Sequence, residues 1–343
     1  MKQFALFLAL LSLCPWLSCT ISSNRFALYG DIAEQQKSLG ALWAMDLSAG
    51  QNLGKVSMQA EYSLYSRFHS EWDGSHDATM TADTYRASIS CSLPQAELRI
   101  GLQRLNFGSA QILRPLQWFD SLDPLDPHQY TKGVDAALLR INWLNNANLW
   151  IWGIRGDPAP KGSEVIGSKE DTIEFGGRFQ HPTPIGEAAL SLHHRELAVG
   201  SEERAGIDLR MDYLMGLWLE ASLSRFSVVR YVPKYLVSAT IGSDYTIDAG
   251  NGLALMLEQM VVSSAPQGLD ELSEERVMSA LMASYPLGIL DSLKALGTYD
   301  WSVLELSLGA SWIRTYDYIS LEASLRNSST AGLSLHTMIN AHF

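Results

Sequence analysis

Hydrophobic and polar residues alternate along most of this chain. At 85–93 the odd positions are apolar or Cys while the even positions carry Arg or Ser, and 173–179, 207–213 and 319–326 repeat this arrangement. Because successive side chains of a β-strand point to opposite faces, a period of two gives each segment one apolar and one polar face. The pattern therefore predicts an all-β protein.

The number and length of these segments predict a barrel. We expect about 16 strands, within a range of about 14 to 18, and each is near the 9–11 residues that cross a bilayer at a tilt. An additional strand is indicated at 39–48. Polar stretches at 69–83, 156–170 and 263–275 predict longer loops at one end, with short turns at the other. The fold class is thus a transmembrane antiparallel β-barrel over 21–343, with membrane lipid around it.

A soluble β-sandwich or β-helix that follows an export signal would also alternate. Three features weigh against these architectures: the chain has no Cys pair beyond its first 20 residues, it has no short repeat, and charged residues such as Arg86, Arg178 and Arg210 stand in mid-strand. Alternation by itself does not separate the three architectures.

The N-terminus is typical of an export signal. Lys2 gives a short positive region, and 4–13 is an unbroken apolar run of signal-peptide length. We assign residues 1–20 to a signal peptide, with Cys19 as an alternative lipidation site. Beyond it no apolar run reaches the length of about 20 residues that a membrane helix requires.

The C-terminus resembles the terminal strand of bacterial outer-membrane proteins. The chain ends on Phe343, and apolar residues alternate behind it from Leu333 onward. This resemblance implies recognition by the barrel-assembly machinery through Phe343 and a location in the bacterial outer membrane. Ala341 departs from the aromatic residue that usually stands two positions before the end.

A second resemblance covers 98–136. Gly101-Leu102-Gln103-Arg104, Phe107-Gly108, the Asp-Pro pairs at 123–124 and 126–127, and Gly133-Val134-Asp135 are similar to porin-like barrels that are distantly grouped with alginate-export proteins. The resemblance implies an outer-membrane channel and says little about its solute. Two departures are Arg114-Pro115 and Ser121-Leu122-Asp123-Pro124, which stand where Asn-Pro pairs are expected.

The segment 108–132 is too long and too rich in Pro and aromatic residues for a plain hairpin connection. Proline fixes its own φ and restricts the residue before it, so each Asp-Pro pair enforces a turn. We predict that this segment folds inward and narrows the pore. Its charged residues are Arg114, Asp120, Asp123 and Asp126.

Charges on the polar face are the candidate functional residues, because charged rings set which ions a pore passes. By strand parity the candidate pore-lining residues are Arg86, Arg99, Arg140, Arg178, Arg195, Arg210, Arg326, Glu174 and Asp208. Two interpretations stay open: a mixed-charge interior that hydrates and braces the wall, or an Arg ladder that selects anionic solutes.

Composition excludes several function classes. Lys and Arg total 25 against 37 Asp and Glu, a formal net charge of -12, so a nucleic-acid partner is not expected. The spacing of Asp120, Asp123 and Asp126 would allow calcium ligands, but these residues fit turns better, and we predict neither a metal nor a cofactor.

An outer-membrane hydrolase is an alternative, since some are barrels. Ser191 and His193 share one strand face, yet no Gly-x-Ser-x-Gly motif occurs. We therefore expect a non-enzymatic porin for small hydrophilic solutes, with anionic solutes as the narrower expectation and a structural or adhesin barrel as the other alternative.

Overall fold

The computed structural model describes residues 18–33, 37–72, 76–121, 131–227, 232–328 and 332–342. Most of the expected signal peptide, its residues 1–17, lies outside these ranges, as does Phe343. The described part forms one 18-stranded antiparallel sheet and the short 3-10 helix η1 (Leu269–Glu271). No helix within it is long and apolar enough to cross a membrane.

The strands follow one another in chain order around the molecule. They are β1 (Ser18–Ala33), β2 (Lys37–Leu53), β3 (Val56–Trp72), β4 (His76–Leu93), β5 (Ala96–Gln103), β6 (Val134–Asn142), β7 (Asn148–Arg155), β8 (Ile173–Thr183), β9 (Gly186–Glu196), β10 (Ser201–Asp212), β11 (Gly216–Ser227), β12 (Tyr235–Ile247), β13 (Leu253–Ala265), β14 (Ser273–Pro286), β15 (Asp291–Asp300), β16 (Glu305–Thr315), β17 (Ile319–Ser328) and β18 (Gly332–His342).

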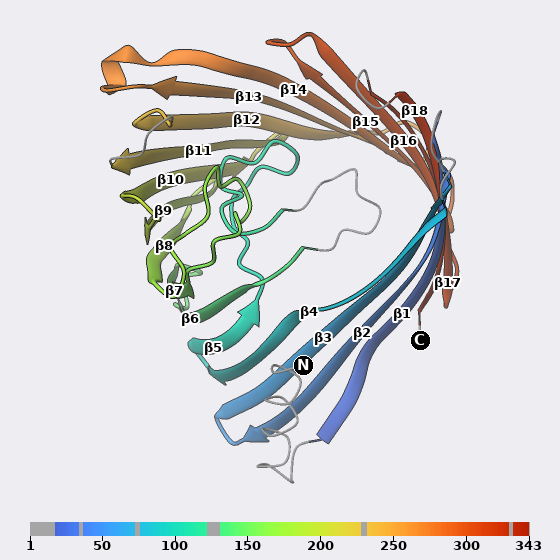
Figure 1. Cartoon of the computed structure of the whole chain (residues 1–343), viewed down its shortest axis with the longest axis horizontal. Helices are drawn as coiled ribbons and strands as arrows, with labels where there is room; N and C mark the ends of the chain where they lie inside the picture. The colour runs from blue at the N-terminus through green and yellow to red at the C-terminus, as the bar shows by residue number, and fades with distance from the viewer. Residues whose placement is uncertain are drawn as a thin grey trace.

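The sheet closes on itself, as Figure 1 shows. Each strand pairs with its neighbours in sequence, and β18 pairs with β1 from Arg25↔His342 to Ala33↔Ser334. Closure satisfies the backbone hydrogen bonds between strands without leaving a free sheet edge, which a membrane-spanning sheet requires. The predicted antiparallel barrel is confirmed, at the upper end of the predicted strand range, and the strand expected at 39–48 lies within β2.

The two ends of the barrel differ. Connections at the end where β18 finishes, such as 54–55 and 184–185, have two to five residues, whereas 104–133 and 156–172 lie at the other end. The expected loop at 69–83 is wrong, because β3 continues to Trp72 and β4 begins at His76. Its Ser, Thr and Asp residues also suit a strand with both faces in water, and 77–83 is exposed throughout.

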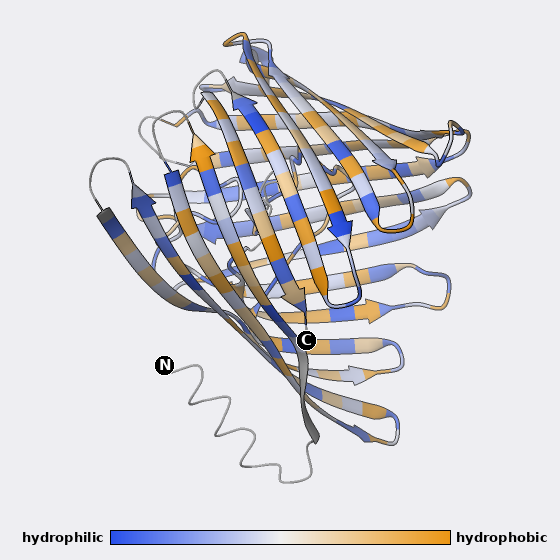
Figure 2. Cartoon of the chain, turned by 90° about the vertical axis from the view of Figure 1, so that its right-hand side faces the viewer, coloured by the Kyte–Doolittle hydropathy of each residue, from blue (hydrophilic) through white to orange (hydrophobic). Residues whose placement is uncertain are grey.

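Hydrophobic and hydrophilic positions alternate along many strands of the wall (Figure 2), and side chains of alternate positions lie on opposite faces. On β9, Leu190 and Leu192 are 50 % and 53 % exposed, while Ser191 and His193 are 0 % and 3 % exposed. The apolar row therefore points outward, where no part of the described chain covers it. The polar row points into the barrel.

The Trp residues of the wall lie on both of its faces. Trp43, Trp143 and Trp301 are exposed on the outer surface, but Trp152 and Trp218 point inward and are almost fully buried. The physical reason is a partner inside the barrel: two loops pack against the wall from β6 to β13.

Candidate functional site: the barrel interior and its two inward loops

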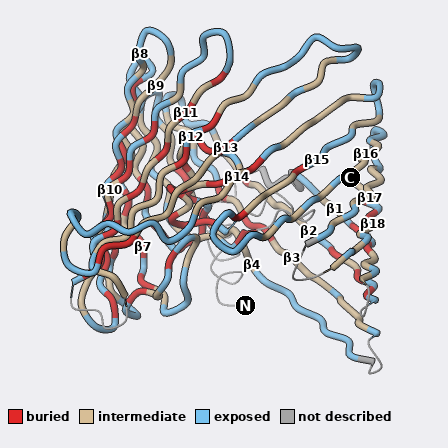
Figure 3. The backbone as a smooth tube through the Cα atoms, turned by 90° about the horizontal axis from the view of Figure 1, so that it is seen from above, coloured by how far each residue is buried: buried red, intermediate tan, exposed pale blue. Residues whose placement is uncertain are grey.

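The interior of the barrel is asymmetric. Buried positions concentrate on the wall from β7 to β13, and far fewer lie on β15 to β18 (Figure 3). Two connections cover this wall from inside, the β5–β6 segment described over 104–121 and 131–133 and the β7–β8 segment 156–172. Figure 1 shows both within the ring of strands.

An apolar cluster fixes the β5–β6 segment to the wall. Phe107 stacks on Trp152 at 5.6 Å between ring centroids, and Phe119 meets His193 edge-on at 5.0 Å. Trp118 lies among them, and its Nε1 donates a hydrogen bond to Ser222 on β11. Aromatic residues of this size bury 150–250 Å² each, so the contact is comparable to a small protein core.

Polar contacts hold the same segment at Asp208. Arg178 on β8 donates to both carboxylate oxygens of Asp208 on β10, at 2.5 and 3.0 Å, and Ser109 donates to Oδ1 at 3.1 Å. A bidentate arginine–carboxylate pair fixes orientation as well as charge. The ion pair therefore fixes the Asp208 carboxylate in the position where it binds Ser109 of the β5–β6 segment.

A buried ion cluster holds the β7–β8 segment. It contains three cations and three carboxylates, so its formal charges balance: Lys161, Arg195, Arg204, Glu164, Glu174 and Glu202. Glu164 of the loop lies 3.1 Å from Arg195 and 3.6 Å from Arg204, and Lys161 lies 2.6 Å from Glu174. Burial raises the pKa of the Glu164 carboxyl, and this outweighs the opposing effect of the nearby cations.

Sequence reasoning missed Glu202 and Arg204, because the β10 strand was expected to begin only at 207. Their signal was available: both share the parity of Asp208 and lie two residues apart. This shared parity is weak evidence for a site, because a stretch of charged residues usually faces solvent. Glu164 could not be predicted from the sequence, because a loop sequence does not indicate which strands the loop packs against.

Four residues expected to line the pore are covered instead. Arg178, Arg195, Glu174 and Asp208 lie on the interior row, but the two loops bury them. The expectation of contact with an aqueous pore fails at these positions because parity predicts the face of a strand and not what lies on that face.

The other five predicted arginines also lie on the interior row and are partly exposed: Arg86, Arg99, Arg140, Arg210 and Arg326. Arg99 forms an ion pair with Glu97 at 2.9 Å, Arg140 stacks on Trp150 at 4.1 Å, and Arg86 donates to the Thr131 carbonyl at 3.1 Å.

Of the four charged residues predicted for the inward segment, the structure describes Arg114 and Asp120. Arg114 and Asp120 form a buried ion pair at 3.0 Å, so the Asp120 carboxylate is engaged within the loop. Asp123 and Asp126 lie outside the described residues. In the part of the chain that the structure describes, no group of three or more His, Cys, Asp or Glu could hold a metal ion.

A cavity opens at the loop end of the barrel. Its volume is about 570 Å³. Its lining includes residues 82–84 of β4 and residues of the β5–β6 and β7–β8 segments. Asp83, Lys132, Asp135 and Asp157 are among its charged residues. The space therefore has a polar, mixed-charge lining.

Ser191 and His193, the residues considered for hydrolysis, have other partners. Ser191 accepts a hydrogen bond from Arg178, while His193 Nδ1 accepts one from Trp152 and its Nε2 lies 3.2 Å from Glu174. Both side chains are buried beneath the loops. This geometry braces the wall and does not present a nucleophile to solvent.

Comparison with protein-family models and with curated proteins finds no match. Solved structures do match over nearly the whole chain. OccD3 (OpdP) of Pseudomonas aeruginosa has a TM-score of 0.62 at 9 % identity, covering 95 % of this chain and 91 % of that chain. OccAB4 of Acinetobacter baumannii has a TM-score of 0.62 at 9 % identity, with 94 % and 96 % covered.

OccK3 (OpdO) of Pseudomonas aeruginosa has a TM-score of 0.60 at 13 % identity, with 96 % of each chain covered. Together with the closed sheet and its apolar outer row, this likeness decides the fold. The chain has the fold of porin-like outer-membrane β-barrels. At these identities the comparison extends to the fold of the porin-like barrel and not to its solute.

Proposed function

We propose that this porin-like barrel is a bacterial outer-membrane channel through which small hydrophilic solutes diffuse. The observation that carries the proposal is the pair of inward loops: they are fixed to one wall of a closed barrel and leave a polar cavity beside them. Because a cavity remains beside these loops, they narrow the passage without filling it, which suits a channel better than a membrane anchor.

Charge on the interior is mixed, and we propose that its unpaired arginines favour anionic solutes. Arg86 and Arg326 make no ion pair with a carboxylate of the described residues, and both remain partly exposed on the interior row. Arg99 has Glu97 close by, so its charge is largely compensated. The preference for anions would then depend mainly on Arg86 and Arg326.

Conductance in planar bilayers tests the channel. The refolded protein should give stepwise conductance in potassium chloride, and a zero-current potential in a salt gradient reports the ratio of anion to cation passage. A barrel that inserts and unfolds normally on heating, yet gives no conductance, would exclude the channel.

Charge reversal tests the selectivity. Arg86→Glu and Arg326→Glu should shift the zero-current potential in the direction that reports greater cation passage, because each replaces a positive interior charge by a negative one. Arg225→Glu is the matched control, since Arg225 lies on the outer row of β11 beside Glu203. Equal potentials for all three variants and the parent would remove the anion hypothesis while leaving the channel intact.

A further inference from the structure

We infer that Glu220 on β11 and Glu258 on β13 are positioning residues that set the width of the channel by holding the backbone of 110–116. This inference rests on the proposed function. Neither residue needs to touch a solute, because each acts through the inward β5–β6 segment.

Glu258 receives four hydrogen bonds at its two carboxylate oxygens. The backbone amides of Gln111, Ile112 and Leu113 donate at 2.7, 3.0 and 2.6 Å, and Trp218 Nε1 donates at 3.0 Å. Three successive amides that converge on one anion form a nest, a backbone geometry that selects negative charge. Here the barrel wall supplies that charge.

Glu220 holds both sides of the same turn. Its Oε2 accepts from the Ala110 amide at 2.9 Å, and its Oε1 accepts from the Leu116 amide at 2.6 Å. Gly108 permits this approach: a Cβ at that position would lie 2.3 Å from Glu220 Oε2, and its φ of 104° is costly for other residues.

The wall therefore determines the conformation of a segment that has no regular structure of its own. Residues 104–121 contain neither strand nor helix, so their amides have few backbone partners. Glu220 and Glu258 are both fully buried and satisfy five of these amides. Hydrogen bonds to charged groups are about twice as strong as neutral ones.

Glu258→Gln is the sharpest change, because it keeps shape and removes charge. All four groups around Glu258 are donors, so in either orientation the Gln amide nitrogen faces two of them. Glu220→Gln loses one of two acceptors in the same way. We expect both variants to loosen the segment without unfolding the barrel, since neither residue takes part in strand pairing through its side chain.

Thiol accessibility measures the loosening without relying on transport. Leu113→Cys, in a background whose native cysteines are replaced by Ser, places a thiol at a buried position of the segment. Adding Glu258→Gln or Glu220→Gln should raise the rate of maleimide labelling by about tenfold, the change that a loss of about 1.4 kcal/mol produces.

Glu322→Gln is the matched control. It removes an equal charge from the interior row of β17, in register with Met338 of β18, far along the sheet from β11 and β13. Its labelling rate should equal that of the parent. A rate unchanged by Glu258→Gln and Glu220→Gln would overturn the inference.

Conductance then links the segment to channel width. Glu258→Gln and Glu220→Gln should increase single-channel conductance or its fluctuation, and Glu322→Gln should leave the fluctuation unchanged. A conducting parent with unaltered variants overturns the inference and keeps the channel. A parent that never conducts overturns the proposed function, and the labelling rates still decide whether these carboxylates hold the segment.

Discussion

At the scale of single residues, the buried ion cluster shows how interior charge depends on its partners. Arg195 contacts Glu202 at 2.5 Å and Glu164 at 3.1 Å, so Arg195→Met leaves two buried carboxylates without this cation. Breaking a buried pair costs about 3–5 kcal/mol. Folded and heat-unfolded barrels migrate differently on a gel. We expect Arg195→Met to lower clearly the temperature at which the folded band is replaced by the unfolded band. Arg225→Met, which breaks the exposed pair with Glu203, should change it little. Equal shifts would contradict a structural role for the cluster.

At the scale of the strand, the apolar outer row is the surface that we propose to contact lipid. Ile207 lies in the middle of β10 on the outer face, in register with Leu190 of β9. Ile207→Arg should destabilise the barrel by about 2–4 kcal/mol, the cost of a cation near the bilayer midplane. Tyr213→Arg, at the tip of the following turn, should cost far less because cations are tolerated at the interface. Denaturant titration in lipid vesicles measures both, and similar costs would show that Ile207 does not face the membrane core.

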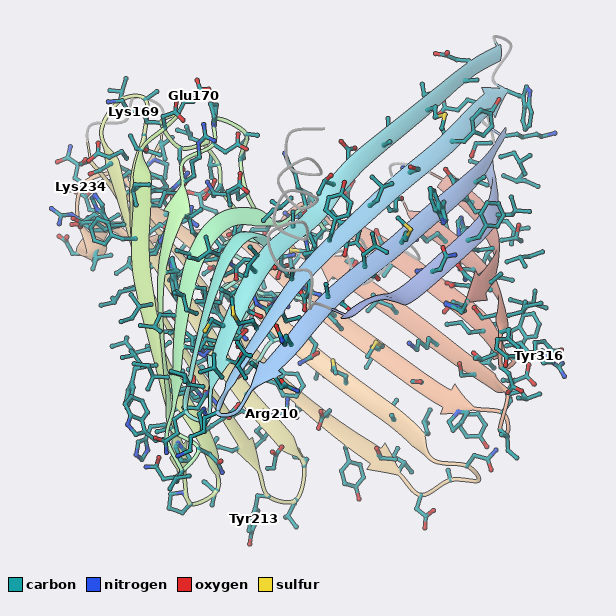
Figure 4. The ribbon with its side chains drawn as sticks, turned by 90° about the horizontal axis from the view of Figure 1, so that it is seen from below. Lys169, Glu170, Arg210, Tyr213, Lys234 and Tyr316 are labelled. Atoms are coloured by element: carbon teal, nitrogen blue, oxygen red, sulfur yellow. The ribbon has the colours of Figure 1, made fainter. Side chains whose placement is uncertain are left out.

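At the scale of the whole molecule, the unequal ends predict an orientation. Lys169, Glu170 and Lys234 lie at the loop end, and Tyr213 lies at the end of the short turns (Figure 4). Outer-membrane barrels carry short turns on the periplasmic side. A membrane-impermeant maleimide should therefore label Glu170→Cys on intact cells, in a background without other cysteines, and should label Tyr213→Cys only after the outer membrane is permeabilised. The reverse pattern would invert the orientation.

The sequence predicted the wall well because each strand repeats one local rule. Parity placed Arg86 and Arg326 on the interior row, because each stands at a polar position of an alternating segment. The prediction is wrong where alternation carries no information. The sequence predicts a loop at Thr79 and Thr81, but both lie in β4, and it does not indicate that a loop covers Trp152 from inside the barrel.

The sequence by itself determined that the chain forms a sheet with one apolar face and one polar face, since the period of hydrophobicity depends only on neighbouring residues. It also indicated a long inward segment, from its prolines and aromatic residues. The tertiary structure decided which interior charges meet water and which hold loops. Glu258 and Leu113 lie 145 residues apart in sequence, and their contact exists only because the closed barrel brings β13 beside the segment that follows β5.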